Sequence, residues 1–273
     1  MRGRTIVQAE RVGAPPGPKY AHLEEAAGQR IRGVRRRGKF LLLPLQGGAR
    51  PGDVLVIHLG MTGRLSARAP EGYERARLTF QEGPDPVLHF QDVRRFGRFL
   101  LLPGGDPAGL PTLAAMGPEP MSRAFDAAAF ARSLQRSRTA VKTYLLSQRP
   151  VAGVGNIYAD EALWRAGIHP ATPARCVSGA QAAALREAIR AVLRNAIRAQ
   201  GTTLNDYRTV NGALGAYAAA LSAYGHAGDA CPRCGGTMER MVLGGRGTHL
   251  CPRCQPASAG PATPLGPSGR LTP

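Results

Sequence analysis

The spacing of hydrophobic and polar positions changes character near residue 115. Before that point, short apolar runs alternate with turns rich in glycine and proline, a pattern typical of β-strands. The expected strands cover residues 5–12, 39–45, 54–59, 77–80, 87–90 and 99–102, and a helix is expected over residues 19–29. Strands so closely spaced along the chain favour a β-sandwich or a barrel.

From about Met116 the apolar positions follow a helical period, which predicts helices over residues 122–138, 139–148, 157–166 and 179–200. The last of these has the clearest ends, because Ser178 and Gln181 match a capping box and Gly201 supplies a stop. We therefore expect an α+β chain of several domains. Its parts are an N-terminal β domain (1–112), a helical domain (113–225), a cysteine module (226–255) and a tail (256–273) whose composition predicts disorder.

The charge of the chain indicates a polyanionic partner. Its 273 residues include 36 Lys and Arg against 18 Asp and Glu, for a net charge of +18 and an isoelectric point near 11.0. Such a field attracts phosphates and releases counterions on contact, although a generally basic proteome is an alternative explanation. Lysine is rare among these cations, so Lys19, Lys39 and Lys142 each merit attention.

No apolar run approaches the roughly 18 residues that a membrane span needs, and the first residues lead into no signal-like apolar core. These features favour a cytosolic protein without membrane contact.

Two C-x-x-C pairs near the end of the chain predict a metal site. Sixteen residues separate the pairs Cys231/Cys234 and Cys251/Cys254, which fits the spacing of four-cysteine zinc modules. Two such turns complete a closed tetrahedral site for one structural Zn²⁺. A disulfide pair or a redox motif is less consistent with a cytosolic chain and a doubled motif. Cys176 stands apart and is expected to be an ordinary thiol.

Between the cysteine pairs, residues 240–243 and 248–250 are predicted strands and residues 244–247 their turn. Arg246 lies among three glycines at this expected tip. Its guanidinium suits a phosphate, and the glycines would allow another molecule to approach closely. On this pattern alone, an ordinary solvated turn arginine is an equally good interpretation.

Five further segments, taken together, carry a family resemblance. They are RRGKF at 36–40, HLGMTG at 58–63, RRFG at 94–97, MGPEP at 116–120 and VAGVGNIYADE at 151–161. With the cysteine module they occur in the order found in formamidopyrimidine-DNA glycosylases, bacterial enzymes that excise oxidised purines such as 8-oxoguanine. The chain resembles this family from about residue 3 to residue 255.

The resemblance implies a clamp made of an N-terminal β-sandwich and a C-terminal helix–two-turns–helix domain with a four-cysteine zinc finger. The family flips the damaged base out of the duplex, excises it and cleaves the strand by β,δ-elimination. The implied partner is double-stranded DNA containing oxidised purines or abasic sites. A monomer with one structural Zn²⁺, in the bacterial cytoplasm at the nucleoid, is the corresponding expectation.

The resemblance also assigns residues that contact DNA. Met61, Arg94 and Phe96 match side chains that fill the space left by the flipped base; without the family, core packing would be the preferred interpretation of Met61 and Phe96. Asn156, in a glycine-rich turn ahead of a predicted helix, fits a phosphate contact. Lys142 matches a lysine near the DNA backbone.

Two residues match catalytic positions. Lys39 corresponds to a lysine assigned to proton transfer and phosphate contact during β-elimination, and Arg246 to the zinc-finger arginine associated with δ-elimination. Both matches agree with the local features noted above, a rare lysine and an arginine beside a glycine-rich turn.

The first residues depart from the family pattern. Relatives begin with a proline, whose secondary amine attacks C1′ of the sugar, followed by a glutamate that acts as acid and base; this chain begins Met1-Arg2-Gly3-Arg4. An α-amino group suits the task because its pKa of about 7.7–8.0 leaves a neutral fraction at pH 7. Three explanations stay open: a start codon placed too far downstream, a damage-binding protein without lyase activity, or a substitute amine from Lys39 or Met1.

A different class of function also fits the charge and the cysteines. A basic zinc-ribbon protein could be a transcription or ribosome-associated factor that binds nucleic acid without repairing it. Such a factor would not require Met61, Arg94 and Phe96 together, and it would not prefer damaged over intact duplex.

Overall fold

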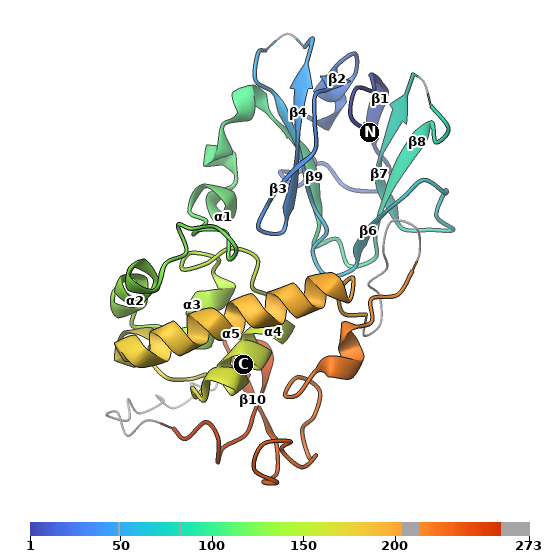
Figure 1. The fold of residues 1–273 in the computed structure, drawn as a ribbon. Coiled ribbons are helices and arrows are strands. Elements are labelled where there is room, and N and C mark those ends of the chain that lie inside the picture. The colour runs from blue at the N-terminus through green and yellow to red at the C-terminus, as the bar shows by residue number, and fades with distance from the viewer. Residues whose placement is uncertain (49, 82, 204–212, 258–273) are drawn as a thin grey trace, which may run out of the picture.

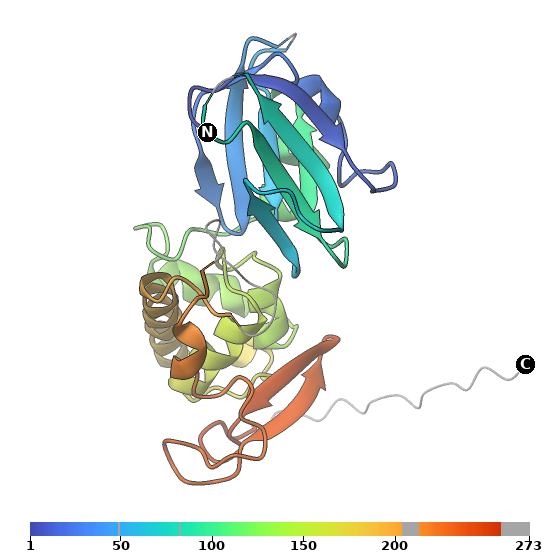
Figure 2. The same ribbon diagram turned by 90° about the vertical axis from the view of Figure 1, so that its right-hand side faces the viewer.

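The structure, a computed structural model, describes residues 1–48, 50–81, 83–203 and 213–257. The β-rich N-terminal half lies above a helical domain, and a hairpin from the end of the chain packs beside the helices with its tip directed toward the β-rich half (Figures 1 and 2). Most of the tail predicted to be disordered, residues 258–273, lies outside the described residues. In the described ranges, no helix combines the length and apolar character that crossing a bilayer requires.

The N-terminal half is a sandwich of two antiparallel sheets. The first has the strand order β1-β7-β8-β6, and in the second β2, β4, β5 and β9 are neighbours while β3 pairs with β4. The strands are β1 (Ile6–Arg11), β2 (Arg30–Ile31), β3 (Arg35–Arg37), β4 (Phe40–Gln46), β5 (Val54–His58), β6 (Gly63–Ser66), β7 (Glu74–Phe80), β8 (Val87–Asp92) and β9 (Arg98–Leu102). All six predicted strands are present. The short strands β2, β3 and β6 were not predicted, because two to four partly polar residues show no apolar alternation.

The main core of the sandwich lies between the two sheets. Ile6 and Leu78 of the first sheet pack with Leu43 and Leu55 of the second, and all four are fully buried. The neighbouring Val56 points to the other face of its sheet, as the two-residue period of a strand requires. There it joins a second apolar cluster with Phe40, Leu110 and Met116. Strand β5 is therefore buried on both faces.

The helix predicted over residues 19–29 is wrong: only one 3-10 turn, η1 (Leu23–Ala26), forms there. The carbonyls of Lys19 and Ala21 accept hydrogen bonds from β9, and Gly28 donates to the carbonyl of Ile6. His22, at φ 57°, turns the chain between these two pairings. Pairing with the sheets on both sides uses the backbone groups that a helix would need.

The helical domain contains α2 (Ala127–Gln135), α3 (Val141–Leu146), α4 (Asn156–Ala166) and α5 (Gly179–Arg198), each within or close to its predicted range. The capping box at Ser178 and Gln181 is present. Gly201 has a φ of 98°, and its amide donates to the carbonyl of Ala196, as expected where a helix ends. Short helical segments complete the domain and its connection to the sandwich: η2 (Pro103–Gly105), η3 (Pro107–Gly109), α1 (Pro111–Ala114), η4 (Ala174–Cys176) and η5 (Tyr217–Ala220).

The last element is a hairpin of β10 (Glu239–Leu243) and β11 (Arg246–Leu250). Leu243 pairs directly with Arg246, so the turn consists of Gly244 and Gly245 alone, at φ 56° and 71°. Two positive φ angles mark the tight turn that suits twisted antiparallel strands. The predicted four-residue turn was therefore too long, and Arg246 is the first residue of β11.

Candidate functional site

Lys39 lies in the turn directly before β4, where the sandwich meets the helical domain. Gly38 precedes it at φ 56° and is buried against Met116, whose Sδ would be 2.5 Å from a Cβ at that position. A larger residue would push away Met116 and the segment around it, which connects the sandwich to the helical domain. Lys39 is thus held at a point where only glycine allows the two parts of the chain to approach so closely.

Glu119 ties the connecting segment to the turn that carries Lys39. Its carboxylate accepts a hydrogen bond from the amide of Gly38 at 2.6 Å and pairs with Arg36 at 2.6 Å. Arg37 donates to the carbonyl of Met116 at 2.8 Å. Burial would raise the pKa of Glu119, but the bonds from Arg36 and Gly38 and the charges of both arginines hold it below its ordinary value. The carboxylate therefore stays ionised and keeps its bonds to Arg36 and Gly38.

The ammonium of Lys39 has an unusual environment. Its side chain keeps contact with solvent, yet the surrounding protein and the charge of Arg246 lower its pKa from 10.5 to about 8. A Cβ on Gly155 would lie 3.6 Å from its Nζ, and no residue of the described ranges accepts a hydrogen bond from it. Lys39 is therefore an accessible amine with a neutral fraction near physiological pH.

His58 lies opposite Phe40 in the sheet, and the two rings are 4.6 Å apart. Burial, with the positive charges of Lys39 and Arg98, lowers the pKa of His58 to about 4. The imidazole is neutral at physiological pH and adds no further positive charge beside Lys39. Its Nδ1 accepts a hydrogen bond from the amide of Gly60 at 3.1 Å, which shapes the next loop.

Met61 and Phe96 are exposed, at 50% and 53%. Core packing, the alternative interpretation of both, is therefore excluded. Their loops touch, because a Cβ on Gly60 would lie 2.7 Å from the backbone of Phe96 and Gly97. The guanidinium of Arg94 lies 5.8 Å from the centre of the Phe96 ring. A flexible thioether, a flat cation and an aromatic ring together offer a surface on which bases can stack.

Asp92, which sequence patterns did not single out, holds these two loops together. Its fully buried carboxylate accepts hydrogen bonds from the Thr62 hydroxyl at 2.6 Å and from the Gly97 amide at 2.7 Å. The same Thr62 oxygen accepts the amide of Arg94 at 3.1 Å. One carboxylate thereby sets the relative positions of Met61, Arg94 and Phe96.

Arg246 approaches this group from the other end of the chain. Its Nη1 lies 3.7 Å from Sδ of Met61, 185 positions earlier in the sequence. It also contributes to the lowered pKa of Lys39. Lys39, Met61 and Arg246 therefore face one region between the sandwich and the hairpin.

Asn156 is the first residue of α4, directly after Gly155. Its side-chain amide donates to the carbonyl of Gly247 at 3.0 Å, whereas Oδ1 is buried without a hydrogen-bond partner in the described part of the chain. The predicted phosphate residue thus also supports the strand that carries Arg246.

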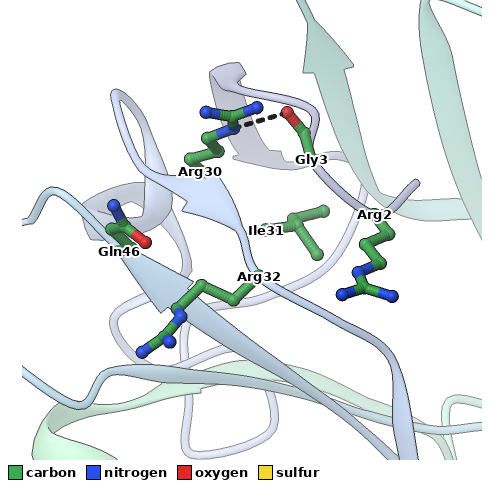
Figure 3. Close-up of a pocket in the computed structure, with 6 residues that line it drawn as sticks. All are labelled: Arg2, Gly3, Arg30, Ile31, Arg32 and Gln46. Carbon is green, nitrogen blue, oxygen red and sulfur yellow. Dashed lines mark hydrogen bonds between the residues drawn. The ribbon is translucent and has the colours of Figure 1, made fainter.

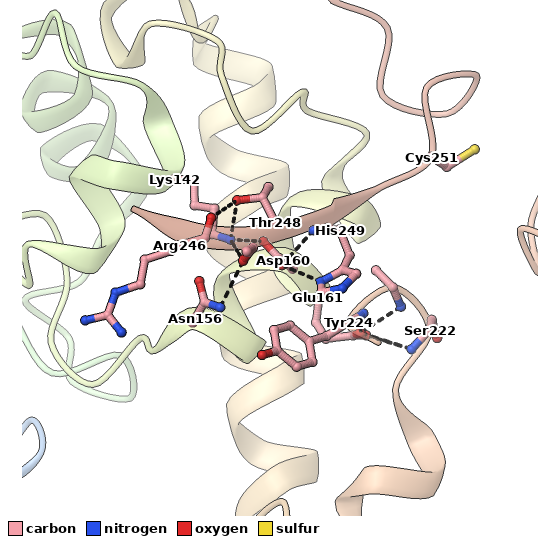
Figure 4. A network of polar contacts seen from close by, with 12 residues as sticks. Lys142, Asn156, Asp160, Glu161, Ser222, Tyr224, Arg246, Thr248, His249 and Cys251 are labelled. Carbon is pink, nitrogen blue, oxygen red and sulfur yellow. Dashed lines mark hydrogen bonds and ion pairs between the residues drawn. The ribbon is translucent and has the colours of Figure 1, made fainter. Parts of the chain in front are cut away.

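Lys142 does not lie where a phosphate contact would place it. It is fully buried, and its Nζ donates to the Gly247 carbonyl at 2.9 Å and the Thr248 hydroxyl at 2.8 Å while pairing with Asp160 at 2.7 Å (Figure 4). The sequence shows a cation in a DNA-binding motif. It does not show that α4 and β11 close over that cation.

The adjacent Glu161 performs a second structural task. Its buried carboxylate accepts backbone amides of Ser222, Ala223 and Tyr224 at 2.8–3.1 Å (Figure 4). It thereby fixes the segment that leads from η5 into the cysteine module. Neither Asp160 nor Glu161 stands out in composition; only their place in the VAGVGNIYADE motif marks them.

The four predicted metal ligands converge. The sulfurs of Cys231, Cys234, Cys251 and Cys254 all lie within 4.8 Å of one another. Tetrahedral zinc with bonds of about 2.3 Å requires sulfurs roughly 3.8 Å apart. The Cys231–Cys254 and Cys234–Cys251 separations, 3.9 and 3.5 Å, agree with this. The donor set fits one structural Zn²⁺, while Cys176 is exposed and separate, as predicted.

A shallow depression of about 290 Å³ lies elsewhere on the sandwich, lined by Arg2, Gly3, Arg30, Ile31, Arg32 and Gln46 (Figure 3). Arg30 closes one side by donating to the carbonyl of Gly3 at 2.7 Å. Gln46 ends the seven-residue strand that Lys39 precedes. Because such a strand spans about 20 Å, this depression is separate from the candidate site.

Comparison with known proteins gives the same family for all three parts of the chain. Three family models match: the formamidopyrimidine-DNA glycosylase N-terminal domain at 1–99, its H2TH domain at 116–208, and a zinc finger found in FPG and IleRS at 228–257. Formamidopyrimidine-DNA glycosylase of Deinococcus radiodurans is 44% identical over 265 residues, covering 94% of this chain and 91% of the relative. The enzyme of Thermus thermophilus is 45% identical over 239 residues, covering 87% and 86%.

Solved structures of Fpg proteins have the same fold as this chain. The MutM (Fpg) protein of Thermus thermophilus has a TM-score of 0.84 at 43% identity, covering 93% of this chain and 92% of that one. Lactococcus lactis Fpg in complex with DNA containing an abasic site has a TM-score of 0.79 at 33% identity, covering 93% of each chain.

The sandwich, the helical domain and the zinc hairpin lie around one region (Figure 2), where cations and exposed apolar side chains converge. This arrangement defines a nucleic-acid-binding enzyme of the clamp type. The chain belongs to the formamidopyrimidine-DNA glycosylase family. It is accordingly a DNA glycosylase and AP lyase that repairs oxidised purines. This membership decides against a transcription or ribosome-associated factor.

Proposed function

We propose that the surface between the sandwich and the hairpin binds duplex DNA at an oxidised purine or abasic site, and that Lys39 and Arg246 act on the exposed nucleotide. Met61, Arg94 and Phe96 fill the gap in the base stack. Lys39 moves protons at the sugar, and Arg246 holds the phosphate that leaves. Asn156 contributes at the backbone of the duplex.

The observation that carries this proposal is the convergence of Lys39, Met61 and Arg246, which come from three separate segments. Two exposed apolar side chains beside two cations suit a duplex, which offers base faces to the first and phosphates to the second. Solved relatives support the same ligand: one is MutM in complex with DNA containing carbocyclic 8-oxo-G, and another is bound to DNA containing an abasic site.

A pair of duplexes tests the proposal. Affinity for an 8-oxoguanine:cytosine duplex is expected to exceed that for the matched guanine:cytosine duplex by at least tenfold at 150 mM salt. The excess should fall when Met61 or Phe96 is replaced by alanine. Equal affinities for the two duplexes would contradict the proposed site.

Borohydride trapping on abasic DNA identifies the attacking amine. Two proteins are compared, residues 1–273 and the same chain preceded by the Pro-Glu leader of the family. A covalent adduct with residues 1–273 that is lost in Lys39→Met assigns the attack to Lys39. An adduct that requires the leader and survives Lys39→Met leaves Lys39 as a proton-transfer group.

Each of the three proposed domains has its own role in binding DNA. Residues 1–112 supply the gap-filling side chains and Lys39, residues 113–225 position the DNA backbone, and residues 226–255 present Arg246. We place the protein at the nucleoid in the bacterial cytoplasm, where its substrate lies, and expect a monomer because one chain contains the whole surface. Light scattering of the DNA complex measures this stoichiometry.

A further inference from the structure

A chain of contacts, one ion pair followed by two hydrogen bonds, runs from the interior of the helical domain to Arg246 (Figure 4). We propose that Asp160, Lys142 and Thr248 form a relay that positions Arg246, and that Lys142 is a positioning residue instead of a phosphate ligand. The inference rests on the proposed function only where it gives Arg246 a phosphate to bind.

The ammonium of Lys142 is enclosed by partners within the protein. A lysine has three N–H donors. Here Nζ donates to the carbonyl of Gly247 at 2.9 Å and to the hydroxyl of Thr248 at 2.8 Å, and it forms an ion pair with Oδ1 of Asp160 at 2.7 Å. The side chain is fully buried. A phosphate contact would require one of these partners to leave and β11 to lift from the helices.

Asp160 connects Lys142 to the backbone of β11. While Oδ1 faces Lys142, Oδ2 accepts the backbone amide of His249 at 3.0 Å. One fully buried carboxylate therefore binds both the α3 lysine and the backbone of β11. Without it, the ammonium would be left as an unpaired buried charge, which is strongly destabilising.

Thr248 links Lys142 to the backbone of Arg246. Its fully buried hydroxyl oxygen accepts a hydrogen bond from Lys142, and its own O–H donates to the carbonyl of Arg246 at 3.1 Å. The next carbonyl, that of Gly247, is held by Lys142 and also by Asn156 at 3.0 Å. With both carbonyls fixed, the two peptide planes that follow Arg246 have one orientation.

The glycine turn explains why such a relay is needed. Arg246 adjoins Gly244 and Gly245, both at positive φ, and its own side chain is exposed. A long arginine beside a flexible turn loses entropy when it binds a phosphate, and fixing its backbone beforehand lowers that loss.

Thr248→Val tests the relay because it removes the hydroxyl and keeps the shape. We expect it to weaken binding to a duplex with an abasic-site analogue about 3- to 10-fold, while Thr248→Ser stays within 2-fold of the wild type. In an Arg246→Ala background, Thr248→Val should change the affinity less than 1.5-fold. Thr79→Val, on the sandwich, is the matched control and should change nothing.

Salt dependence separates positioning from direct contact for Lys142. Each lost phosphate contact lowers the slope of log K against log salt by about 0.9. In an Arg246→Ala background, Lys142→Met should leave this slope unchanged. A further fall of about 0.9 would overturn the proposal, as would an equal effect of Thr248→Val with and without Arg246. Should Lys142→Met fail to fold, the threonine variants carry the test alone.

Hydrogen exchange of the free protein separates this inference from the proposed function. Thr248→Val should accelerate exchange of the amides at residues 247–250 at least 5-fold, with Thr248→Ser near the wild type. If Arg246→Ala leaves DNA binding unchanged while exchange accelerates as expected, the phosphate role of Arg246 fails and the relay stands. Unchanged exchange in Thr248→Val contradicts the relay.

Discussion

Nη1 of Arg246 lies 3.7 Å from Sδ of Met61 and joins the zinc hairpin to the β-sandwich. Both side chains are exposed, and the contact is the weak kind that a sulfur acceptor makes. A phosphate is a far stronger partner for a guanidinium than a thioether is, so we expect bound DNA to replace this contact and release Met61 toward the base stack. The two residues thus mark where the surfaces of the clamp meet.

Met61→Ala and Phe96→Ala should each weaken binding to a duplex with an abasic-site analogue about 5- to 20-fold. The reason is that burying such a side chain in the stack contributes about 1–2 kcal/mol. Binding to intact duplex should change less than 2-fold, as measured by fluorescence anisotropy. Ile197→Ala, at the 69% exposed Ile197 of α5, is the control. Equal losses on both duplexes would contradict a gap-filling role.

The pKa of Lys39, lowered to about 8, predicts a pH dependence. Its neutral fraction should rise with a midpoint near pH 8, where an unperturbed lysine titrates near pH 10.4. Because the charge of Arg246 contributes to the lowering, Arg246→Met should move the midpoint upward. Reductive methylation of the accessible amine against pH, followed by mass spectrometry, measures both values.

The same shift has a consequence for stability. The folded protein disfavours the protonated form of Lys39, so the destabilisation is fully present below pH 8 and disappears as the pH rises toward 10.4. Lys39→Met should therefore raise Tm at pH 7 more than at pH 10.5, relative to the wild type at each pH. An equal change at both pH values would contradict the lowered pKa.

Asp92→Asn should disorder the two loops that carry Met61, Arg94 and Phe96. The variant replaces an oxygen that accepts the Thr62 hydroxyl or the Gly97 amide by an amino group, leaving a buried donor unpaired. The expected cost is about 1–3 kcal/mol in the free energy of unfolding, together with loss of lesion preference. Urea denaturation and lesion binding measure the two effects. Asp85→Asn, at an exposed loop, should change neither.

Removal of zinc should abolish tight DNA binding through Arg246. Structural zinc supplies folding free energy to small modules, so β10 and β11 are expected to lose order on chelation. Metal analysis should give one zinc per chain, and a strong chelator should reduce the affinity at least to that of Arg246→Ala. Cys251→Ser should behave like the chelated protein, whereas Cys176→Ser, at an exposed thiol, should keep both metal and affinity.

Glu161→Gln should destabilise the junction between helices and zinc module by about 1–3 kcal/mol. The carboxylate accepts backbone amides from three consecutive residues, and the variant turns one acceptor oxygen into a donor. Thermal unfolding, followed at Trp164 beside the zinc module, measures the change. Glu187→Gln on α5, where the side chain is 61% exposed, is the matched control.

Local patterns determined much of this protein. The six predicted strands, the four helices after residue 115, the capping box at Ser178 and the cysteine spacing depend on residues near one another in the chain, and these are present in the structure. The family motifs, taken in their order along the chain, also identified Lys39, Met61 and Arg246 as candidate site residues. The expected helix over residues 19–29 was wrong because its fate depended on pairing with β9 and β1, which no local pattern contains.

Only the tertiary structure decided which polar groups are buried and with whom they pair. Lys142 belongs to a DNA-binding motif, yet α4 and β11 enclose it beside Asp160, 18 positions later, and Thr248, 106 positions later. Asp92 and Glu119 likewise gained their roles from partners in distant segments. A short-range pattern records what a residue can do chemically; the partners that fold around it set whether it meets the ligand or holds the residue that does.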